Sequence, residues 1–324
     1  MKNIGFLRFD PLFYNKIWGG NRLKTVLGKS CTDDHIGESW EISGVANKET
    51  IVSTGKHKGK TINELIQEFG ADLVGVDCYY RFRNKFPLLI KFIDTAAPLS
   101  IQVHPDDVLA KERHGSFGKN EMWYILDADK DSELVLGFKS ELNKKTFLKS
   151  IIASEILSQM NFEKVTTGDV FNIPAGRIHA IGKGILLVEI QQTSDITYRV
   201  YDYDRIDQKT NKKRELHIDQ SIDAIDFKPI DTYKTEYDKN ENKINSLVST
   251  PFFVTRYIEL TKTMKLKQEK NIFRIFICLE GKGTISSIDE QMTIKRGQTI
   301  FVPANLIDIT IDPLEKAKFL EVSV

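Results

Sequence analysis

The residues GDVFNIPAGRIHAIGKG (168–184) carry the clearest indication of the fold. They contain a short β-like run that is bounded by glycines and a proline, which are typical of turns. The same pattern occurs twice, because residues 166–179, TTGDVFNIPAGRIH, align without a gap with residues 295–308, KRGQTIFVPANLID. Both copies have the glycine, an alternation of residue types and then a Pro-Ala pair. This internal repeat predicts two β-domains of one kind in tandem.

The composition is that of an ordinary globular protein with a substantial core, since 41% of the 324 residues are hydrophobic and 28% are charged. The 46 basic and 45 acidic residues give a formal net charge of +1, which argues against a broad nucleic-acid or membrane surface. No apolar run approaches the roughly 18–20 residues that span a bilayer, and the first residues offer no signal-peptide core. We therefore expect a cytoplasmic protein with no nucleic-acid or membrane partner. Its cysteines are odd in number and scattered, as in reduced cytosolic proteins: Cys31, Cys78 and Cys278.

Many short β-like runs separated by glycine and proline predict an antiparallel sandwich or barrel. Helices are expected over residues 61–70, which have a capping-box spacing, over 106–115 and over 143–160. The polar residues 226–246 are interpreted as a linker. The basic run KTNKKR (209–214) is interpreted as a solvated loop rather than a phosphate or partner site.

One stretch carries the candidate chemistry. In SIQVHPDD (100–107), Gln102 and His104 are one residue apart, so a strand would point both side chains to the same side. Glu121 follows in GKNEMWYIL. A single histidine on a strand is more often a satisfied core or surface residue than a ligand, so these residues alone leave a metal site and ordinary packing both open.

Further motifs resolve this choice by resemblance. GDVFNIPAGRIHAIGKG resembles the second sequence motif of the cupin family, in which a histidine points into the barrel. Over nearly its whole length the chain resembles the shorter, bacterial form of type I mannose-6-phosphate isomerase. The motifs are IWGG (17–20), IGESWEIS (36–43), PLLIKFIDTAAPLSIQVHPDD (87–107), GKNEMWYIL (118–126), GDVFNIPAGRIHAI (168–181) and VEIQQTSDITYRVYDYDR (188–205).

The resemblance implies a mainly β fold of two tandem cupin domains, which are jelly-roll β-barrels, with a small helical insertion. The N-terminal catalytic domain is expected over residues 1–235, including a helical insert at about 140–162. The C-terminal cupin-like domain is expected over residues 240–324, without a metal site. Asp308 stands in the second copy where the first has His179, so this copy is expected to keep the fold and to lack the ligand.

The family's metal ligands carry over to Gln102, His104, Glu121 and His179. Two imidazoles, a carboxylate and an amide oxygen suit zinc above all, although iron, manganese or cobalt would also fit. We expect one Zn²⁺ per chain. One departure is that Asn120 stands where longer family members have proline, in their Lys-Pro-Glu.

The family's catalytic arginine carries over to Arg199. Lys119 is expected to face the barrel with Glu121, where a buried lysine favours a role with an anionic substrate. Glu189 could face inward as a catalytic group or be an ordinary strand carboxylate paired to an arginine. The weaker candidates for binding the substrate are Glu38, in GESWEIS, and Trp18, for which core packing is the alternative.

The resemblance implies reversible conversion of mannose 6-phosphate and fructose 6-phosphate through an enediol. A divalent metal and Arg199 would hold the negative charge that develops. The base stays open among Lys119, Glu189, a metal-bound water and a ligand-edge group, and the phosphate contact is unassigned. The alternatives are another metal-dependent cupin enzyme and a non-catalytic sugar-binding bicupin. The sequence leaves the oligomeric state open.

Overall fold

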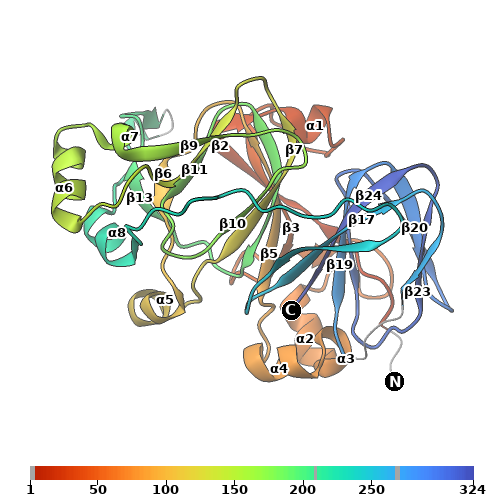
Figure 1. Cartoon of the computed structure of the whole chain (residues 1–324). Coiled ribbons are helices and arrows are strands. Elements are labelled where there is room, and N and C mark those ends of the chain that lie inside the picture. The colour runs from red at the N-terminus through yellow and green to blue at the C-terminus, as the bar shows by residue number, and fades with distance from the viewer. Residues whose placement is uncertain (1–3, 208–209, 267–270) are drawn as a thin grey trace.

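The computed structural model describes residues 4–207, 210–266 and 271–324, and it shows two β-barrels side by side (Figure 1). The first barrel is made of two antiparallel sheets. Its six-stranded sheet has the order β10-β7-β12-β5-β2-β3. These strands are β2 (Leu12–Gly20), β3 (Ile36–Ser43), β5 (Leu88–Thr95), β7 (Glu121–Ala128), β10 (Val170–Ile173) and β12 (Ile185–Gln192).

The opposite sheet of the first barrel has the order β13-β6-β11-β8-β9. Its strands are β6 (Ile101–Val103), β8 (Glu133–Phe138), β9 (Met160–Lys164), β11 (His179–Ile181) and β13 (Tyr198–Tyr201). Two short ribbons lie outside these sheets, and they pair β1 (Phe9–Asp10) with β4 (Ile51–Val52) and β14 (Ile206–Asp207) with β15 (Lys212–Lys213).

The second barrel has sheets of the orders β16-β17-β24-β19-β22 and β18-β23-β20-β21. The first sheet is formed by β16 (Ile244–Ser249), β17 (Val254–Leu260), β19 (Arg274–Glu280), β22 (Thr299–Val302) and β24 (Ala317–Ser323). The second is formed by β18 (Met264–Leu266), β20 (Lys282–Ser286), β21 (Gln291–Lys295) and β23 (Ile309–Pro313). The two copies of the repeat form the equivalent strands β10 and β22, each directly followed by the Pro-Ala pair, and the mainly β, two-barrel prediction is confirmed.

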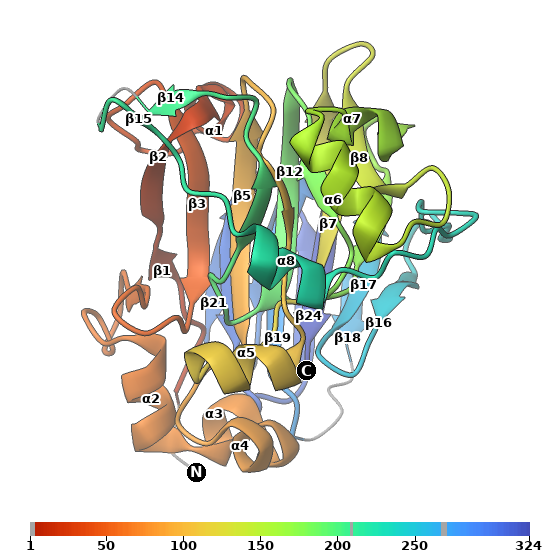
Figure 2. The ribbon, with the colours of Figure 1, turned by 90° about the vertical axis from the view of Figure 1, so that its left-hand side faces the viewer.

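The helices lie at the ends and edges of the barrels, and Figure 2 views the first barrel from the side where α5, α6 and α8 lie. The helix expected over 61–70 is α2 (Ile62–Phe69), with the capping box between Thr61 and Glu64 in place. The helix expected over 106–115 is α5 (Asp107–His114), which Asp106 caps. The others are α1 (Arg22–Thr25), α3 (Ala71–Val74), α4 (Val76–Phe82) and α8 (Ile218–Ala224).

The insert near residues 140–162 differs from the single helix expected over 143–160. It contains α6 (Lys144–Ile152) and α7 (Ile156–Gln159), and the chain then enters strand β9 at Met160. The break lies at Ser154, whose φ of 59° is in the left-handed region and cannot continue a right-handed helix. The apolar periodicity therefore correctly predicts helical structure here, but the helix is interrupted at Ser154 and divided into α6 and α7.

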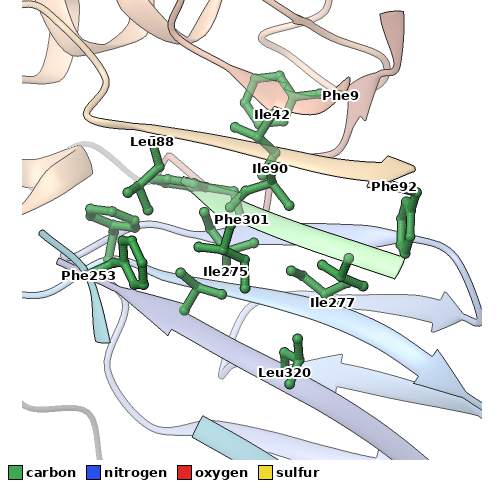
Figure 3. Packing of buried hydrophobic residues seen from close by; sticks show 14 of the residues in the cluster. Phe9, Ile42, Leu88, Ile90, Phe92, Phe253, Ile275, Ile277, Phe301 and Leu320 are labelled. Atoms are coloured by element: carbon green, nitrogen blue, oxygen red, sulfur yellow. The ribbon is translucent and has the colours of Figure 1, made fainter. Parts of the chain in front are cut away.

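The two barrels share one apolar core. On β5, Leu88, Ile90 and Phe92 point outward while Lys91 points inward, as strand alternation requires. Figure 3 shows these outward residues against Ile275 and other residues of the second barrel. All of them belong to a single buried cluster that also includes Ile277, Phe301 and Leu320. The second barrel therefore braces the back of the sheet whose front faces the first barrel's interior.

Replacing Phe301 tests whether the two barrels stabilise each other through this shared core. Its side chain is fully buried, and its ring lies 5.2 Å from that of Phe273 and 6.0 Å from that of Phe86. Phe301→Ala is expected to lower the free energy of unfolding by about 3–5 kcal/mol, as for other large-to-small core changes. Denaturant unfolding measures it, with Ile288→Ala as the control because Ile288 is 93% exposed. A loss below about 1 kcal/mol would show that the barrels do not share this core.

The N-terminal residues belong structurally to the second barrel. Leu7 pairs with Phe301, and their backbones exchange two hydrogen bonds of 2.9 Å. Phe6 is buried in the second barrel's own core and donates its backbone N–H to Glu290 at 2.8 Å. The second barrel is thus completed by a segment from the other end of the chain, outside the range 240–324.

Of the residues 226–246 interpreted as a linker, 226–243 contain no helix or strand in the described structure, whereas 244–246 begin strand β16. The segment 226–243 runs beside β10, where Lys234 forms an isolated bridge with Phe171 and the Tyr237 hydroxyl donates to the Gly168 carbonyl at 2.8 Å. Among the described residues, no helix has the length and apolar character needed to cross a bilayer.

Candidate active site

Strand register brings three of the predicted site residues side by side. On the five-stranded sheet, Gln102 of β6 lies opposite His179 of β11 on one side and Arg199 of β13 on the other. Directly opposed residues of an antiparallel pair have neighbouring side chains. The amide nitrogen of Gln102 lies 3.4 Å from Nε2 of His179, and a half-turn of the amide would present its oxygen there instead.

Glu121 approaches the same point from the opposite sheet. It is the first residue of β7 and is fully buried. Its Oε1 lies 3.3 Å from Nε2 of His179, and its Oε2 lies 3.6 Å from Nε2 of His104. Among the described residues, His104, Glu121 and His179 are the one group of histidine, cysteine and carboxylate side chains whose ligand atoms all lie within 4.8 Å of one another.

The surroundings of the two histidines prepare them as ligands. Nδ1 of His104 lies 2.9 Å from the carbonyl of Ile196, and Nδ1 of His179 lies 2.8 Å from the carbonyl of Arg177. Because a carbonyl only accepts, both Nδ1 atoms carry the hydrogen and both Nε2 lone pairs face the centre. Burial and the nearby Lys119 ammonium lower the pKa of His179 to about 3 and hold that of His104 well below its usual value. Both imidazoles are therefore neutral near pH 7, as metal ligands must be.

The carboxylate of Glu121 also fits a cation. Its Oε1 is buried without a hydrogen-bond partner among the described residues, although buried polar atoms are normally satisfied, and its Oε2 is in an ion pair with Lys119. Burial and repulsion from Glu189 raise the pKa of Glu121 to about 7. An adjacent cation would lower that pKa again. The donor set and the unpartnered Oε1 of Glu121 thus suit a divalent metal.

Lys119 shares this centre. Its Nζ lies 2.8 Å from Oε2 of Glu121 and 2.9 Å from Nε2 of His104. It is buried and faces the barrel interior, as the alternation from Glu121 predicts. An ammonium and a metal compete for the same lone pair of His104, so Lys119 must donate elsewhere when that lone pair is ligated.

Glu189 also faces inward, and its partner is a lysine rather than the arginine considered from the sequence. Its Oε1 accepts from Nζ of Lys91 at 2.8 Å, and its Oε2 accepts from Nε1 of Trp123 at 2.9 Å. Burial favours the neutral acid, but the attraction of Lys91 and Lys119 outweighs it and lowers the pKa of Glu189 to about 2. Attraction to Glu189 and Glu38 overcomes the effect of burial on Lys91 and raises its pKa to about 12. Both groups are therefore charged at neutral pH.

Glu38 and Trp18 line the same cavity. Glu38 accepts a hydrogen bond of 2.7 Å from Nε1 of Trp40 and lies 3.1 Å from Nζ of Lys16. Burial opposes its charge, yet Lys16 and Lys91 together with Trp40 hold its pKa below the usual value. Trp18 is 4% exposed and packs in the barrel's core cluster, so most of its ring is core and one part meets the cavity.

Arg199 is not paired with Asp202, the aspartate three residues after it. Asp202 instead accepts from Nε of Arg214 at 2.8 Å and also binds Arg205. Nη1 of Arg199 donates to the carbonyl of Glu215 at 2.8 Å, while its Nε is buried without a hydrogen-bond partner among the described residues. Burial and the repulsion of Arg214 lower its pKa, although an arginine stays cationic.

A cavity of about 340 Å³ is lined by the other site residues, which are Trp18, Glu38, Gln102, Lys119, Glu189 and Arg199. His104, Glu121 and His179 do not line it themselves, but they contact its wall at Gln102 and Lys119. The lining has six lysines and arginines against three carboxylates, Glu38, Glu189 and Asp195, so it carries excess positive charge. Arg214 shows that the basic run 209–214 is not solvated throughout, and Lys209 of that run lies outside the described residues. Several lining residues were not predicted from the sequence: Tyr14, Lys16, Lys48, Lys91, Asp195, Thr197 and Arg214.

Two protein-family models match the chain. They are "Phosphomannose isomerase type I, catalytic domain" over residues 6–146 and "Mannose-6-phosphate isomerase, cupin domain" over residues 243–316. The first range contains Gln102, His104 and Glu121.

Full-length relatives cover both barrels. Mannose-6-phosphate isomerase of Streptococcus mutans is 36% identical over 304 residues, which are 91% of this chain and 92% of that protein. Mannose-6-phosphate isomerase ManA of Bacillus subtilis is 35% identical over 315 residues, 94% of this chain and 95% of that protein. A crystal structure of the mannose 6-phosphate isomerase from Bacillus subtilis has a TM-score of 0.88 at 32% identity and covers 98% of this chain and 99% of that chain.

Proposed function

The chain belongs to the type I phosphomannose isomerase family, and on that premise we propose that the cavity beside His104, Glu121 and His179 is where it interconverts mannose 6-phosphate and fructose 6-phosphate. The chain is an intramolecular aldose–ketose isomerase. The observation that carries the location is the convergence of three buried ligand groups directly behind Gln102 and Lys119, which line the cavity together with Arg199.

The reaction moves a proton between C1 and C2 of the open-chain sugar through an enediol. The difficulty is the low acidity of a carbon next to a carbonyl, since negative charge builds up on the two oxygens. We propose that His104, Glu121, His179 and the amide oxygen of Gln102 hold one Zn²⁺, which when bound acts as a Lewis acid toward those oxygens. Arg199 sits next to Gln102 across the strand pair and would stabilise the same charge with its planar donors.

Lys119 and Glu189 differ in their fitness as proton carriers. A carboxylate whose pKa lies near 2 is a weak base at neutral pH, and both oxygens of Glu189 are already bound. Lys119 has mobile donors at the centre, and we propose that it moves the proton between the oxygens on C1 and C2. The excess positive charge of the cavity supports binding of a phosphorylated sugar. Glu38 and Trp18 would contact the sugar at the wall of the cavity.

Metal removal tests this assignment. We expect dialysis against a chelator to abolish conversion of mannose 6-phosphate in a coupled assay, and one equivalent of Zn²⁺ per chain to restore it. Fe²⁺, Mn²⁺ and Co²⁺ serve as comparisons, because the donor set also accepts them. Full activity of the metal-depleted protein, measured beside its metal content, would contradict the proposed centre. Unfolding curves before and after dialysis separate loss of metal from loss of structure.

A further inference from the structure

The buried pair of Lys91 and Glu189 has a counterpart in the second barrel. In the first barrel, strand register places Phe171, Trp123, Glu189 and Lys91 in one row across β10, β7, β12 and β5. The row ends in an ion pair of 2.8 Å between side chains that are 7% and 4% exposed.

The second barrel contains the equivalent row. The gapless repeat aligns Phe171 with Ile300. Ile300 lies opposite Phe276, Phe276 opposite Glu321, and Glu321 opposite Arg256, across β22, β19, β24 and β17. Each position therefore has its equivalent, with Glu321 in the place of Glu189 and Arg256 in the place of Lys91.

The metal carboxylate is the position that differs. Glu121 lies opposite Ile173, and Val302, which aligns with Ile173, lies opposite Arg274. Nε of Arg274 lies 3.1 Å from Glu321, and Nη1 of Arg256 lies 3.5 Å from the same oxygen. The second barrel thus has an arginine where the first has a ligand, and this buried Arg274 is a nearer partner of the buried Glu321 than Arg256, whose side chain is 31% exposed.

From this we propose that Lys91 is a positioning residue of the active site, whose role is to hold the charged Glu189 in the barrel wall, and that Glu189 is not the catalytic base. The argument rests on the proposed function of the first barrel. A buried glutamate that is held by cationic side chains in both barrels, although the second barrel has an arginine at the position of the metal carboxylate, belongs to the framework common to both barrels. Lys91 then orients Glu189, which in turn holds the indole of Trp123. The ring of Trp123 contacts His179 edge-on, with centroids 5.3 Å apart, so the pair acts on the centre through packing.

A double-mutant cycle tests the proposal. Lys91→Met and Glu189→Gln each leave one buried charge unpaired, whereas the double variant removes both charges. We expect each single change to lower kcat at least tenfold, and the double variant to recover at least tenfold over Glu189→Gln. A catalytic base typically contributes about 10²–10⁴-fold, so if Glu189 were the base, the double variant would stay as inactive as Glu189→Gln. That result would overturn the proposal.

Conservative variants give a second readout. Lys91→Arg copies the side chain that the second barrel has at this position, and we expect it to retain most of the kcat that Lys91→Met loses. A loss equal to that of Lys91→Met would show that the ammonium itself is needed and would overturn the positioning role. Arg256→Lys is the matched control in the second barrel, with unchanged kcat expected.

Metal content and urea midpoints are measured for every variant. The midpoints of the cycle report the coupling of Lys91 and Glu189 without any substrate. If the unchanged protein failed to isomerise mannose 6-phosphate, the proposed function would fail while these midpoints still tested the pair. If the shifts in urea midpoint of the two single variants simply add up in the double variant, Lys91 and Glu189 are not coupled, and the proposed pair is contradicted.

Discussion

Replacing His179 with alanine is expected to release the metal and to lower kcat/KM with mannose 6-phosphate by about 10³-fold or more. His179 is fully buried, its Nε2 lies 3.3 Å from Glu121, and its Nδ1 is held by the carbonyl of Arg177. Its loss removes one of the two imidazoles proposed as metal ligands. A Lewis-acidic metal supplies several kcal/mol of transition-state stabilisation, and each 1.4 kcal/mol is about tenfold in rate. Metal analysis and steady-state kinetics on the same preparation measure both effects.

The repeat supplies the matched control. Asp308 aligns with His179, is exposed and has a φ of 60°, which asparagine tolerates. Asp308→Asn is expected to keep the metal and to keep turnover within a few-fold. Full metal occupancy in a folded His179→Ala protein would remove His179 from the ligand set. A loss in Asp308→Asn as large as that in His179→Ala would give the second barrel a part in the chemistry.

Arg199→Ala is expected to lower kcat by about 10²–10³ while the metal content stays the same. Such losses are typical when a donor to a developing oxyanion is removed. Arg199 lies across the strand pair from Gln102. Asp202 forms its hydrogen bonds with Arg205 and Arg214, so the positive charge of Arg199 is not neutralised by an ion pair with Asp202. Arg199→Lys keeps the charge but loses the planar fork, and an intermediate kcat is expected.

The comparison for Arg199 is an arginine at the surface. Arg113 pairs with Asp223 on the outside of the protein, and exposed pairs of this kind contribute about 0–1 kcal/mol to stability. Arg113→Ala is therefore expected to leave kcat unchanged. A near-normal kcat in Arg199→Ala would exclude Arg199 from catalysis, and lost metal in that variant would mean that it supports the ligands instead.

The residues that could be predicted are those whose neighbours are close in sequence or set by strand alternation. Gln102 and His104 share a face because they are two residues apart in an extended chain, and Lys119 and Glu121 share a face for the same reason. The repeat around His179 predicted two barrels, and the capping residues Thr61 and Asp106 predicted two helices with nearly correct ends.

The residues that were missed come together only through tertiary structure. Lys48 and Asp195 both line the cavity and form a salt bridge of 2.6 Å, although 147 positions separate them in the sequence. Each is a polar loop residue with no local sequence pattern to indicate this contact. Arg214 was hidden in a basic run that resembles any solvated loop. Lys91 did carry a signal, because a lysine inside the apolar run PLLIKFID must find a buried partner. Its partner Glu189 is 98 positions away, and only the pairing of β5 with β12 reveals it.

The return of the N-terminal segment to the second barrel has a consequence for synthesis on the ribosome. The hydrogen bond from Phe6 to Glu290 joins residues 284 positions apart. At about 5–20 residues per second, Phe6 and Leu7 wait roughly 15–60 s before their partners are translated. During that time the first barrel has the residues it needs to assemble, whereas these two apolar side chains are available to chaperones. Closure of the second barrel by this segment therefore has to wait until Phe301 has been translated, and contacts of such long sequence separation form slowly.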